Sequence, residues 1–172
     1  MSILDFILLI ILFGFTFAGF WFGLIHSIGA LVGTVAGVIV AGNYFAWLGS
    51  IIQPILMNNE NLAKIIAFIL LFIIANRLVG FIFWIIGKVF NVLTVLPFLK
   101  TINRLSGAVL GLVEGILVLG IILVMIGKFP FSSYIIPAMD TSQVAKFLVN
   151  AGKILMPLLP DVIEYTKSYL PF

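Results

Sequence analysis

The chain has 172 residues, of which 63% are hydrophobic and only 9% are charged, and its formal net charge is +3 at pH 7. A soluble domain carries about 25% charged residues, so this composition excludes a disordered regulator, a disulfide-bonded secreted scaffold and an ordinary soluble enzyme. It is typical of a protein that crosses a membrane several times. The nine Lys and Arg residues are dispersed along the chain, which predicts no nucleic-acid partner.

The first two spans are predicted from a long uncharged stretch, residues 6–59, which contains no Asp, Glu, Lys or Arg. As a single helix it would be about 81 Å long, whereas a bilayer core is about 30 Å thick, so the chain must turn back within it. We expect the turn around Gly23, where the polar His26 interrupts the apolar sequence. The predicted spans are 4–22 and 26–48.

The first span starts with an acidic residue, Asp5, where a signal peptide would carry Lys or Arg. No A-x-A cleavage site precedes the second span. We therefore interpret the first span as a retained helix, with Asp5 expected to cap its N-terminus.

Two further spans follow a loop that is predicted over residues 49–61, where polar residues cluster. The third span is predicted over 62–87 and the fourth over 105–127, joined by a loop, 88–104, that carries three basic residues. The chain is thus predicted to be an all-α, polytopic membrane protein with four transmembrane helices in two helical hairpins, forming a domain over residues 1–128. Because the positive charges are densest in the third loop, we expect this loop in the cytoplasm and both termini outside.

Residues 129–172 are predicted to form an interfacial amphipathic tail. After Thr141 and Ser142 as caps, apolar and polar residues alternate with helical spacing. The apolar face contains Val144, Phe147, Leu148, Ala151 and Leu155, and the polar face contains Gln143, Lys146, Asn150 and Lys153. Such a helix can lie on the membrane surface, with Lys146, Lys153, Phe147 and Leu148 as interfacial residues, or pack against the helical bundle, and both interpretations stay open. A second, short helix is predicted over 161–169.

Glycine recurs at every fourth position in the second and the fourth span. The residues are Gly29, Gly33 and Gly37, and Gly107, Gly111 and Gly115. Ladders of small residues let a neighbouring helix approach closely, which matters in lipid because apolar burial gives helices little reason to associate there. We expect these glycines to mediate helix packing inside one subunit, with contact between copies as the alternative.

Two ionisable residues, Arg77 and Glu114, lie within spans. Each is ten or eleven residues from the basic loop, and therefore about 15 Å deep. A charge near the bilayer centre costs at least about 2.5 to 3.5 kcal/mol. We therefore hypothesise an ion pair between Arg77 and Glu114, which either only locks the third and fourth spans in register or takes part in moving an ion or a substrate.

The sequence offers no recognisable catalytic centre. It contains no cysteine, a single histidine, no phosphate-binding glycine-lysine loop and no G-x-S-x-G or H-E-x-x-H motif. We predict a protein that is not an enzyme and needs no cofactor or metal. Two functions stay open: an accessory or scaffold protein that organises a lipid surface or another membrane protein, and a small, homo-oligomeric transporter or channel with Arg77 and Glu114 facing its path.

Four features together resemble a known family. They are the early acidic residue Asp5, a hairpin turn at Gly19 to Gly23, the glycine ladder of the second span, and the stretch INRLSGAVLGLVEG at 102–115. Over about residues 3–127 these resemble the CvpA family, the colicin V production proteins of bacterial inner membranes. The resemblance implies a multi-pass inner-membrane protein linked to colicin V production or export and to integrity of the cell envelope. It implies no biochemical activity and no functional residues.

The chain departs from the pattern of that family at three positions. Family members usually carry basic residues on the two sides of the hairpin turn, where this chain has Phe22 and His26. They also often carry a basic residue where Glu114 stands.

Overall fold

The computed structural model describes residues 2–91, 97–128 and 135–159, and the regular elements within these ranges are all helical. The long helices are α1 (Ile3–Phe22), α2 (Leu24–Ile52), α3 (Glu60–Asn91) and α4 (Pro97–Lys128). The short ones are α5 (Ile135–Thr141), α6 (Gln143–Gly152) and the 3-10 helices η1 (Gln53–Leu56) and η2 (Lys153–Leu158). The four long helices are each long and apolar enough to cross a membrane, which confirms the four predicted spans.

The loops are shorter than the sequence predicts. Helix α3 continues to Asn91 and α4 already begins at Pro97, so Lys88 and Arg104 lie on helices and not in a loop. Proline suits the first turn of a helix, where its missing N–H costs no hydrogen bond, so Pro97 begins a helix here. Polar residues near the ends of a span do not by themselves end the helix.

The predicted turn at Gly23 is confirmed. Gly23 separates α1 from α2 with φ +84° and ψ −175°, a conformation that is essentially restricted to glycine. Its N–H donates to the carbonyl of Gly19 at 2.8 Å and so closes the last turn of α1.

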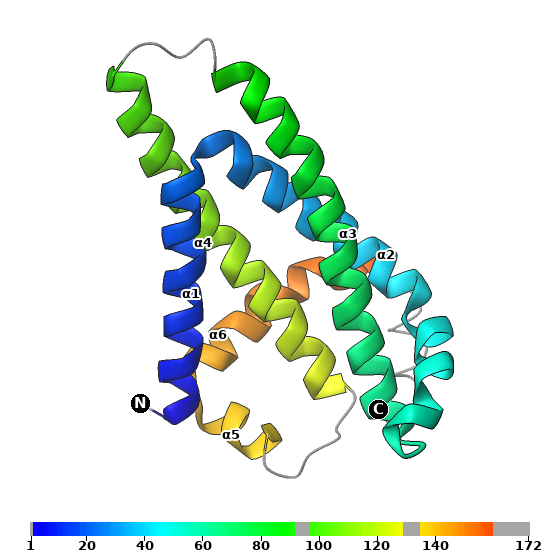
Figure 1. The fold of residues 1–172 in the computed structure, drawn as a ribbon. Helices are drawn as coiled ribbons and strands as arrows, with labels where there is room; N and C mark the ends of the chain where they lie inside the picture. Colours follow the sequence, from blue (N-terminus) through cyan, green and yellow to red (C-terminus); the bar gives the residue numbers. More distant parts are fainter. Residues whose placement is uncertain (1, 92–96, 129–134, 160–172) are drawn as a thin grey trace.

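The main packing partners are not neighbours in the chain. Helix α1 packs along α4, and α2 packs along α3, whereas α1 and α2 diverge after their turn and α3 scarcely touches α4 (Figure 1). The bundle therefore consists of two helix pairs, α1–α4 and α2–α3, which are joined mainly where α2 meets α4.

In the α1–α4 pair, glycines bring two backbones into contact. A Cβ atom added to Gly107 would collide with the carbonyl oxygen of Gly19, and one added to Gly19 would collide with that of Gly107. A Cβ on Gly111 would lie 2.5 Å from the carbonyl oxygen of Phe15. The glycines of α4 thus meet α1 of the same subunit.

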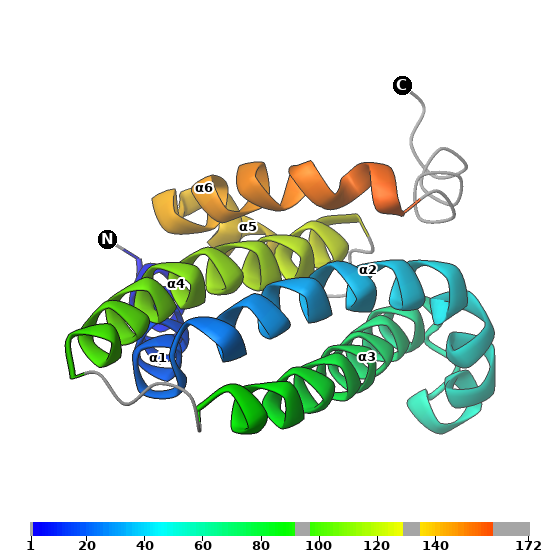
Figure 2. The same cartoon turned by 90° about the horizontal axis from the view of Figure 1, so that it is seen from above.

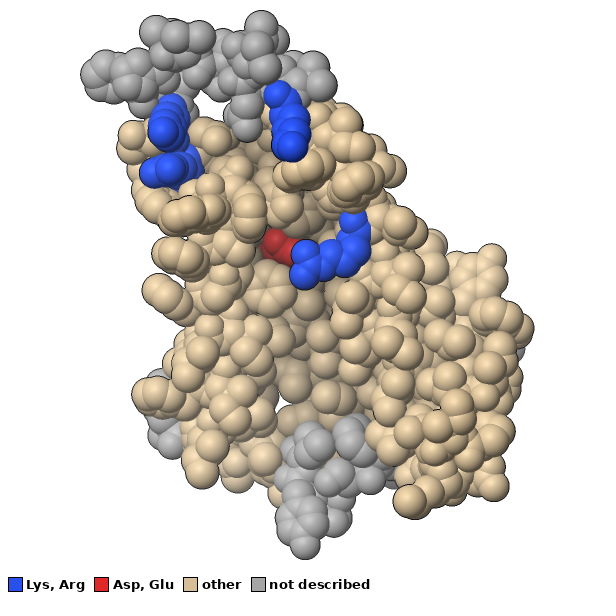
Figure 3. All heavy atoms as spheres, viewed as in Figure 1, with Lys and Arg blue, Asp and Glu red and all other residues tan. Residues whose placement is uncertain are grey.

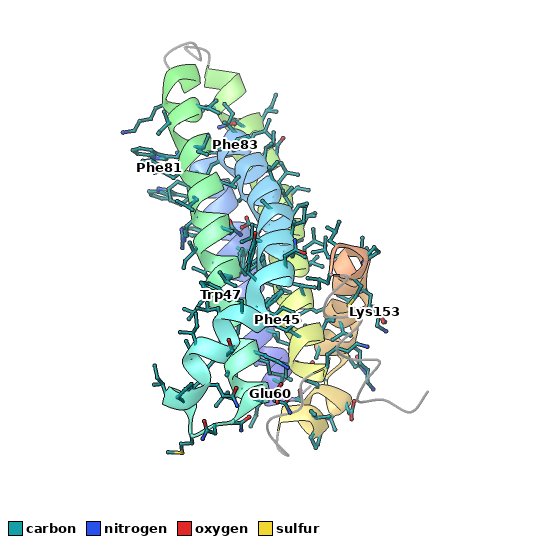
Figure 4. The ribbon with its side chains drawn as sticks, turned by 90° about the vertical axis from the view of Figure 1, so that its right-hand side faces the viewer. Phe45, Trp47, Glu60, Phe81, Phe83 and Lys153 are labelled. Atoms are coloured by element: carbon teal, nitrogen blue, oxygen red, sulfur yellow. The ribbon has the colours of Figure 1, made fainter. Side chains whose placement is uncertain are left out.

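In the α2–α3 pair, glycines mainly accommodate side chains. An added Cβ on Gly29 would collide with the side chain of Phe83, and one on Gly37 would lie 2.9 Å from the Phe72 ring. In Figure 4, Phe83 points toward α2, whereas Phe81 points away from it. The glycines of α2 therefore also pack within one subunit.

The tail helix α6 packs across α4, on the side of the bundle away from α3 (Figure 2). Its Gly152 meets the backbone of α4 at Gly120, and Leu148 is fully buried. Phe147 is 59% exposed, and Lys153 points outward in Figure 4. The apolar face of α6 thus packs against the bundle at Leu148. This side chain is buried against α4, so it is not one of the interfacial residues that the sequence predicts.

Two apolar clusters hold these layers together. One joins α2, α3, α4 and the chain around η2, and its largest fully buried side chains are Phe45, Phe68, Ile121, Met125 and Leu159. The other joins α1, α4 and α6 through Leu8, Leu12, Leu119, Leu123, Ala145 and Leu148. The helix predicted over 161–169 lies outside the described residues.

Candidate functional site

The hairpin turn is held by the motif that carries the resemblance to the CvpA family. The Oδ1 atom of Asn103 on α4 accepts a hydrogen bond from the Leu24 N–H at 3.0 Å, which caps the first turn of α2. The hydroxyl of Ser27 lies 3.1 Å from the carbonyl oxygen of Gly107 and 3.1 Å from that of Gly23. The motif thus fastens α4 to the turn, with its asparagine as a cap and its first glycine as the contact point.

Asp5 is a buried carboxylate, 2% exposed, that joins two helix N-termini. It forms a capping box with Ser2: the Ser2 N–H donates to Asp5 Oδ2 at 2.6 Å, and the Asp5 N–H donates to the Ser2 hydroxyl at 3.1 Å. The capping role predicted for Asp5 is confirmed.

The same carboxylate also binds the start of α6. Its Oδ1 atom accepts hydrogen bonds from the Ser142 hydroxyl at 2.5 Å and from the Val144 N–H at 3.1 Å. Ser142 is the N-cap of α6, since its hydroxyl also accepts from the Ala145 N–H at 2.9 Å. The negative charge of Asp5 therefore stands where the dipoles of two helices are positive. The sequence alone could not show this second role, because 137 positions separate Asp5 from Ser142.

The hollow between the two helix pairs is a cavity of about 800 Å³. Its walls carry five aromatic side chains: Phe15, Phe22, Phe72, Phe81 and Trp84. Its polar lining comes from α2, α3 and α4 and consists of His26, Ser27, Asn76, Arg77 and Glu114. Figure 3 shows this face of the molecule hollowed between the helices, with an acidic group beside a basic side chain in the hollow. A mostly apolar cavity with a few convergent polar groups is typical of a ligand site.

Arg77 and Glu114 line this cavity from α3 and α4, respectively. The predicted direct ion pair between Arg77 and Glu114 is not formed. Among the residues that the structure describes, an ion pair within 4.0 Å is found between Lys64 and Glu60, and not between these two. The physical reason is the packing of the bundle: α3 belongs to one helix pair and α4 to the other, and the cavity lies between them. Two opposite charges thus line one cavity with no N–O distance of 4.0 Å or less between them, although they interact electrostatically.

His26 is a third polar group of the cavity. The sequence places it at the hairpin turn, but its ring lies inside the cavity, 4.6 Å from the Phe22 ring centroid to centroid. Its Nδ1 atom is buried and has no hydrogen-bond partner in the described part of the chain. Asn76, in contrast, is engaged: its Nδ2 donates to the Thr34 hydroxyl at 3.4 Å.

One end of the bundle is basic. In Figure 3, positive side chains gather over the ends of α3 and α4 that adjoin their connection. There Lys88 Nζ lies 3.9 Å from the centroid of the Trp84 ring, and the Arg104 guanidinium lies 5.7 Å from that of Phe20. Basic and tryptophan side chains together are typical of the membrane surface.

No group of three or more His, Cys, Asp or Glu that could hold a metal ion occurs within residues 2–91, 97–128 and 135–159. The cavity is the site that the sequence indicated only in part. Arg77 and Glu114 stood out as charges within spans, whereas His26 and the aromatic walls did not, because they come from different helices and share no periodic pattern.

The fold and this site define a polytopic α-helical membrane protein with a cavity between its helices that is lined by aromatic and a few polar side chains. Residues 4–153 match the family model described as Colicin V production protein. Because the match covers most of the chain, the protein belongs to the colicin V production protein family. The match includes the part of the tail that forms α6. No curated protein and no solved structure matches the chain.

Proposed function

We propose that this protein is a non-enzymatic accessory or scaffold protein of the bacterial inner membrane that acts in colicin V production or export and in integrity of the cell envelope. The single observation that carries the proposal is the match of residues 4–153 to the Colicin V production protein family. The exposed apolar surface supports it. Helix α1 presents Phe13, Phe17 and Trp21 in a row of successive ring contacts at 6.4 and 6.1 Å, which is a surface for lipid or for a helix of another membrane protein.

The proposal is tested by removing the gene from a bacterium that secretes colicin V and returning it on a plasmid. We expect secreted toxin to fall and to recover with the intact gene, while the purified, reconstituted protein conducts no ions. Unchanged toxin secretion together with an unchanged detergent sensitivity of the cells would contradict the proposal.

A second candidate function is a small oligomeric transporter or channel. It is favoured by one observation, the presence of Arg77 and Glu114 in the same cavity. This candidate predicts flux through liposomes that Glu114→Gln abolishes while the protein stays folded and oligomeric. Flux that is absent, or that Glu114→Gln leaves unchanged, would rule it out.

A further inference from the structure

The cavity between the helix pairs has the chemistry of a lipid-binding site, independently of any role in toxin export. It opens sideways: Phe81 and Trp84 at its edge are 59% and 41% exposed, and α3 and α4 scarcely touch beside it. Since the surrounding helices are candidate membrane spans, the opening faces the acyl chains of the bilayer. A membrane lipid can therefore enter without crossing water.

The charges inside the cavity define what can bind. One guanidinium, that of Arg77, and one carboxylate, that of Glu114, line the cavity and form no ion pair with each other. A purely anionic ligand would satisfy Arg77 but be repelled by Glu114, and a purely cationic ligand would do the reverse. A ligand that carries both a positive and a negative group would satisfy both at once and leave the site neutral.

Hydrogen-bonding capacity narrows the ligand further. The guanidinium has five N–H donors in a planar fork that matches a phosphate, whereas a carboxylate accepts hydrogen bonds from an ammonium group. His26 Nδ1, buried at this cavity without a partner in the described residues, provides a further ring nitrogen in the same lining. A primary ammonium, with three N–H donors, uses such acceptors, and a quaternary ammonium cannot.

The shape and place of the cavity agree with a lipid. About 800 Å³ with five aromatic walls accommodates a headgroup and the first part of its acyl chains. Helices α3 and α4 have 32 residues each and are about 48 Å long, more than a bilayer core of about 30 Å, so their basic ends project to the surface of one leaflet. Arg77 and Glu114 lie near the middle of these two helices, 14 residues before Asn91 and 17 residues after Pro97, and on α3 the cavity lining continues from Arg77 toward the basic end as far as Trp84.

We propose that this cavity binds one phospholipid of the phosphatidylethanolamine type, with its phosphate on Arg77, its primary ammonium on Glu114 and its acyl chains against the aromatic walls. The lipid replaces the direct ion pair that the two side chains do not form. Binding would make the two helix pairs of the bundle one lipid-bridged unit.

The test uses the full chain in nanodiscs, with Trp84 as a reporter in the cavity. Trp21 and Trp47, which are 63% and 62% exposed, are replaced by Phe, so that Trp84 is the single tryptophan of the chain. Its fluorescence is quenched with brominated phosphatidylethanolamine, phosphatidylcholine or phosphatidylglycerol. We expect phosphatidylethanolamine to bind about tenfold more tightly than either of the other two lipids. One extra hydrogen bond between charged groups accounts for a difference in affinity of this size.

Three variants within the cavity and one control variant outside it complete the test. Arg77→Gln and Glu114→Gln are each expected to abolish the preference, and Arg77→Lys to keep part of it, while Arg104→Gln, which changes a basic residue outside the cavity, leaves it intact. Circular dichroism checks that each variant is folded, and if Arg77→Gln does not fold, Glu114→Gln and Arg77→Lys still decide. Equal quenching by the three lipids overturns the proposal. So does a preference for phosphatidylglycerol, or a preference for phosphatidylethanolamine that survives Glu114→Gln.

Discussion

The two helix pairs use the same glycine spacing for different contacts. In the α1–α4 pair, Gly107 faces the backbone of Gly19, and neither side can yield without moving a whole helix. In the α2–α3 pair, a Cβ added to Gly37 would lie 2.9 Å from the ring of Phe72 and 3.1 Å from the Phe72 carbonyl oxygen. The same sequence pattern thus marks one contact in which an added methyl group would overlap a backbone carbonyl and another in which it would press mainly on a side-chain ring. The pair α1–α4 also holds a third helix, α6, through Asp5.

The largest effect is expected at the backbone contact of the α1–α4 pair. Gly107→Val places three carbon atoms against the carbonyl of Gly19 and the backbone of Gly23, and we expect it to lower the free energy of unfolding by about 3 kcal/mol or more. The measurement is denaturation in detergent micelles, followed by circular dichroism. Gly127→Val on the same helix is the control, because an added Cβ there has no neighbour within 4 Å. Equal losses in the two variants would show that glycine is not required by the contact with α1.

The next effect concerns the attachment of α6 to the α1–α4 pair. Asp5→Ala leaves the Ser142 hydroxyl and the Val144 N–H without their acceptor, and we expect a loss of about 2 kcal/mol. Hydrogen exchange should accelerate at the start of α6 and stay slow in the middle of α4. Asp140→Ala, an exposed acidic residue on the neighbouring α5, should change neither. Uniform acceleration along the chain would mean that Asp5 supports the whole fold and not this attachment.

A smaller effect is expected at the side-chain contact of the α2–α3 pair. In Gly37→Ala the methyl group meets the Phe72 ring at 2.9 Å and the Phe72 carbonyl oxygen at 3.1 Å, so Phe72 must shift by a few tenths of an ångström. Alanine also favours a helix over glycine by about 0.8 to 1.0 kcal/mol, so we expect a net change of less than about 1 kcal/mol. Gly107→Ala, measured in the same way, should cost clearly more. If the two alanine variants are equally unstable, the distinction between the pairs is wrong.

The smallest effect is expected between the pairs, across the cavity. Because Arg77 and Glu114 form no direct ion pair, a double-mutant cycle of Arg77→Gln with Glu114→Gln should give a coupling of less than about 0.5 kcal/mol in detergent without phosphatidylethanolamine. The exchange of the two residues, Arg77→Glu with Glu114→Arg, should then be no more stable than the single changes predict. A coupling above about 1 kcal/mol would indicate a direct pair.

The sequence was sufficient for features that depend on neighbours along the chain. The uncharged stretch required a hairpin because its length as one helix exceeds the bilayer, and Gly23 is where the chain turns. Ser142 as a cap and the helical spacing after it correctly predicted α6. Asp5 as a cap of α1 followed from its position in the first turn.

Only the tertiary structure decided which helices meet. Consecutive helices pack side by side only where their surfaces fit, and here Gly19 and Gly107 let α1 lie against α4, while Phe83 and Phe72 fit the glycines of α2. That choice separates Arg77 from Glu114, opens the cavity that His26 shares with them, and buries Leu148 against α4. Hydropathy and spacing along the chain determine that these helices form and cross a membrane. They contain no information on which helix fills a given glycine groove, because that depends on the shapes of two surfaces far apart in the sequence.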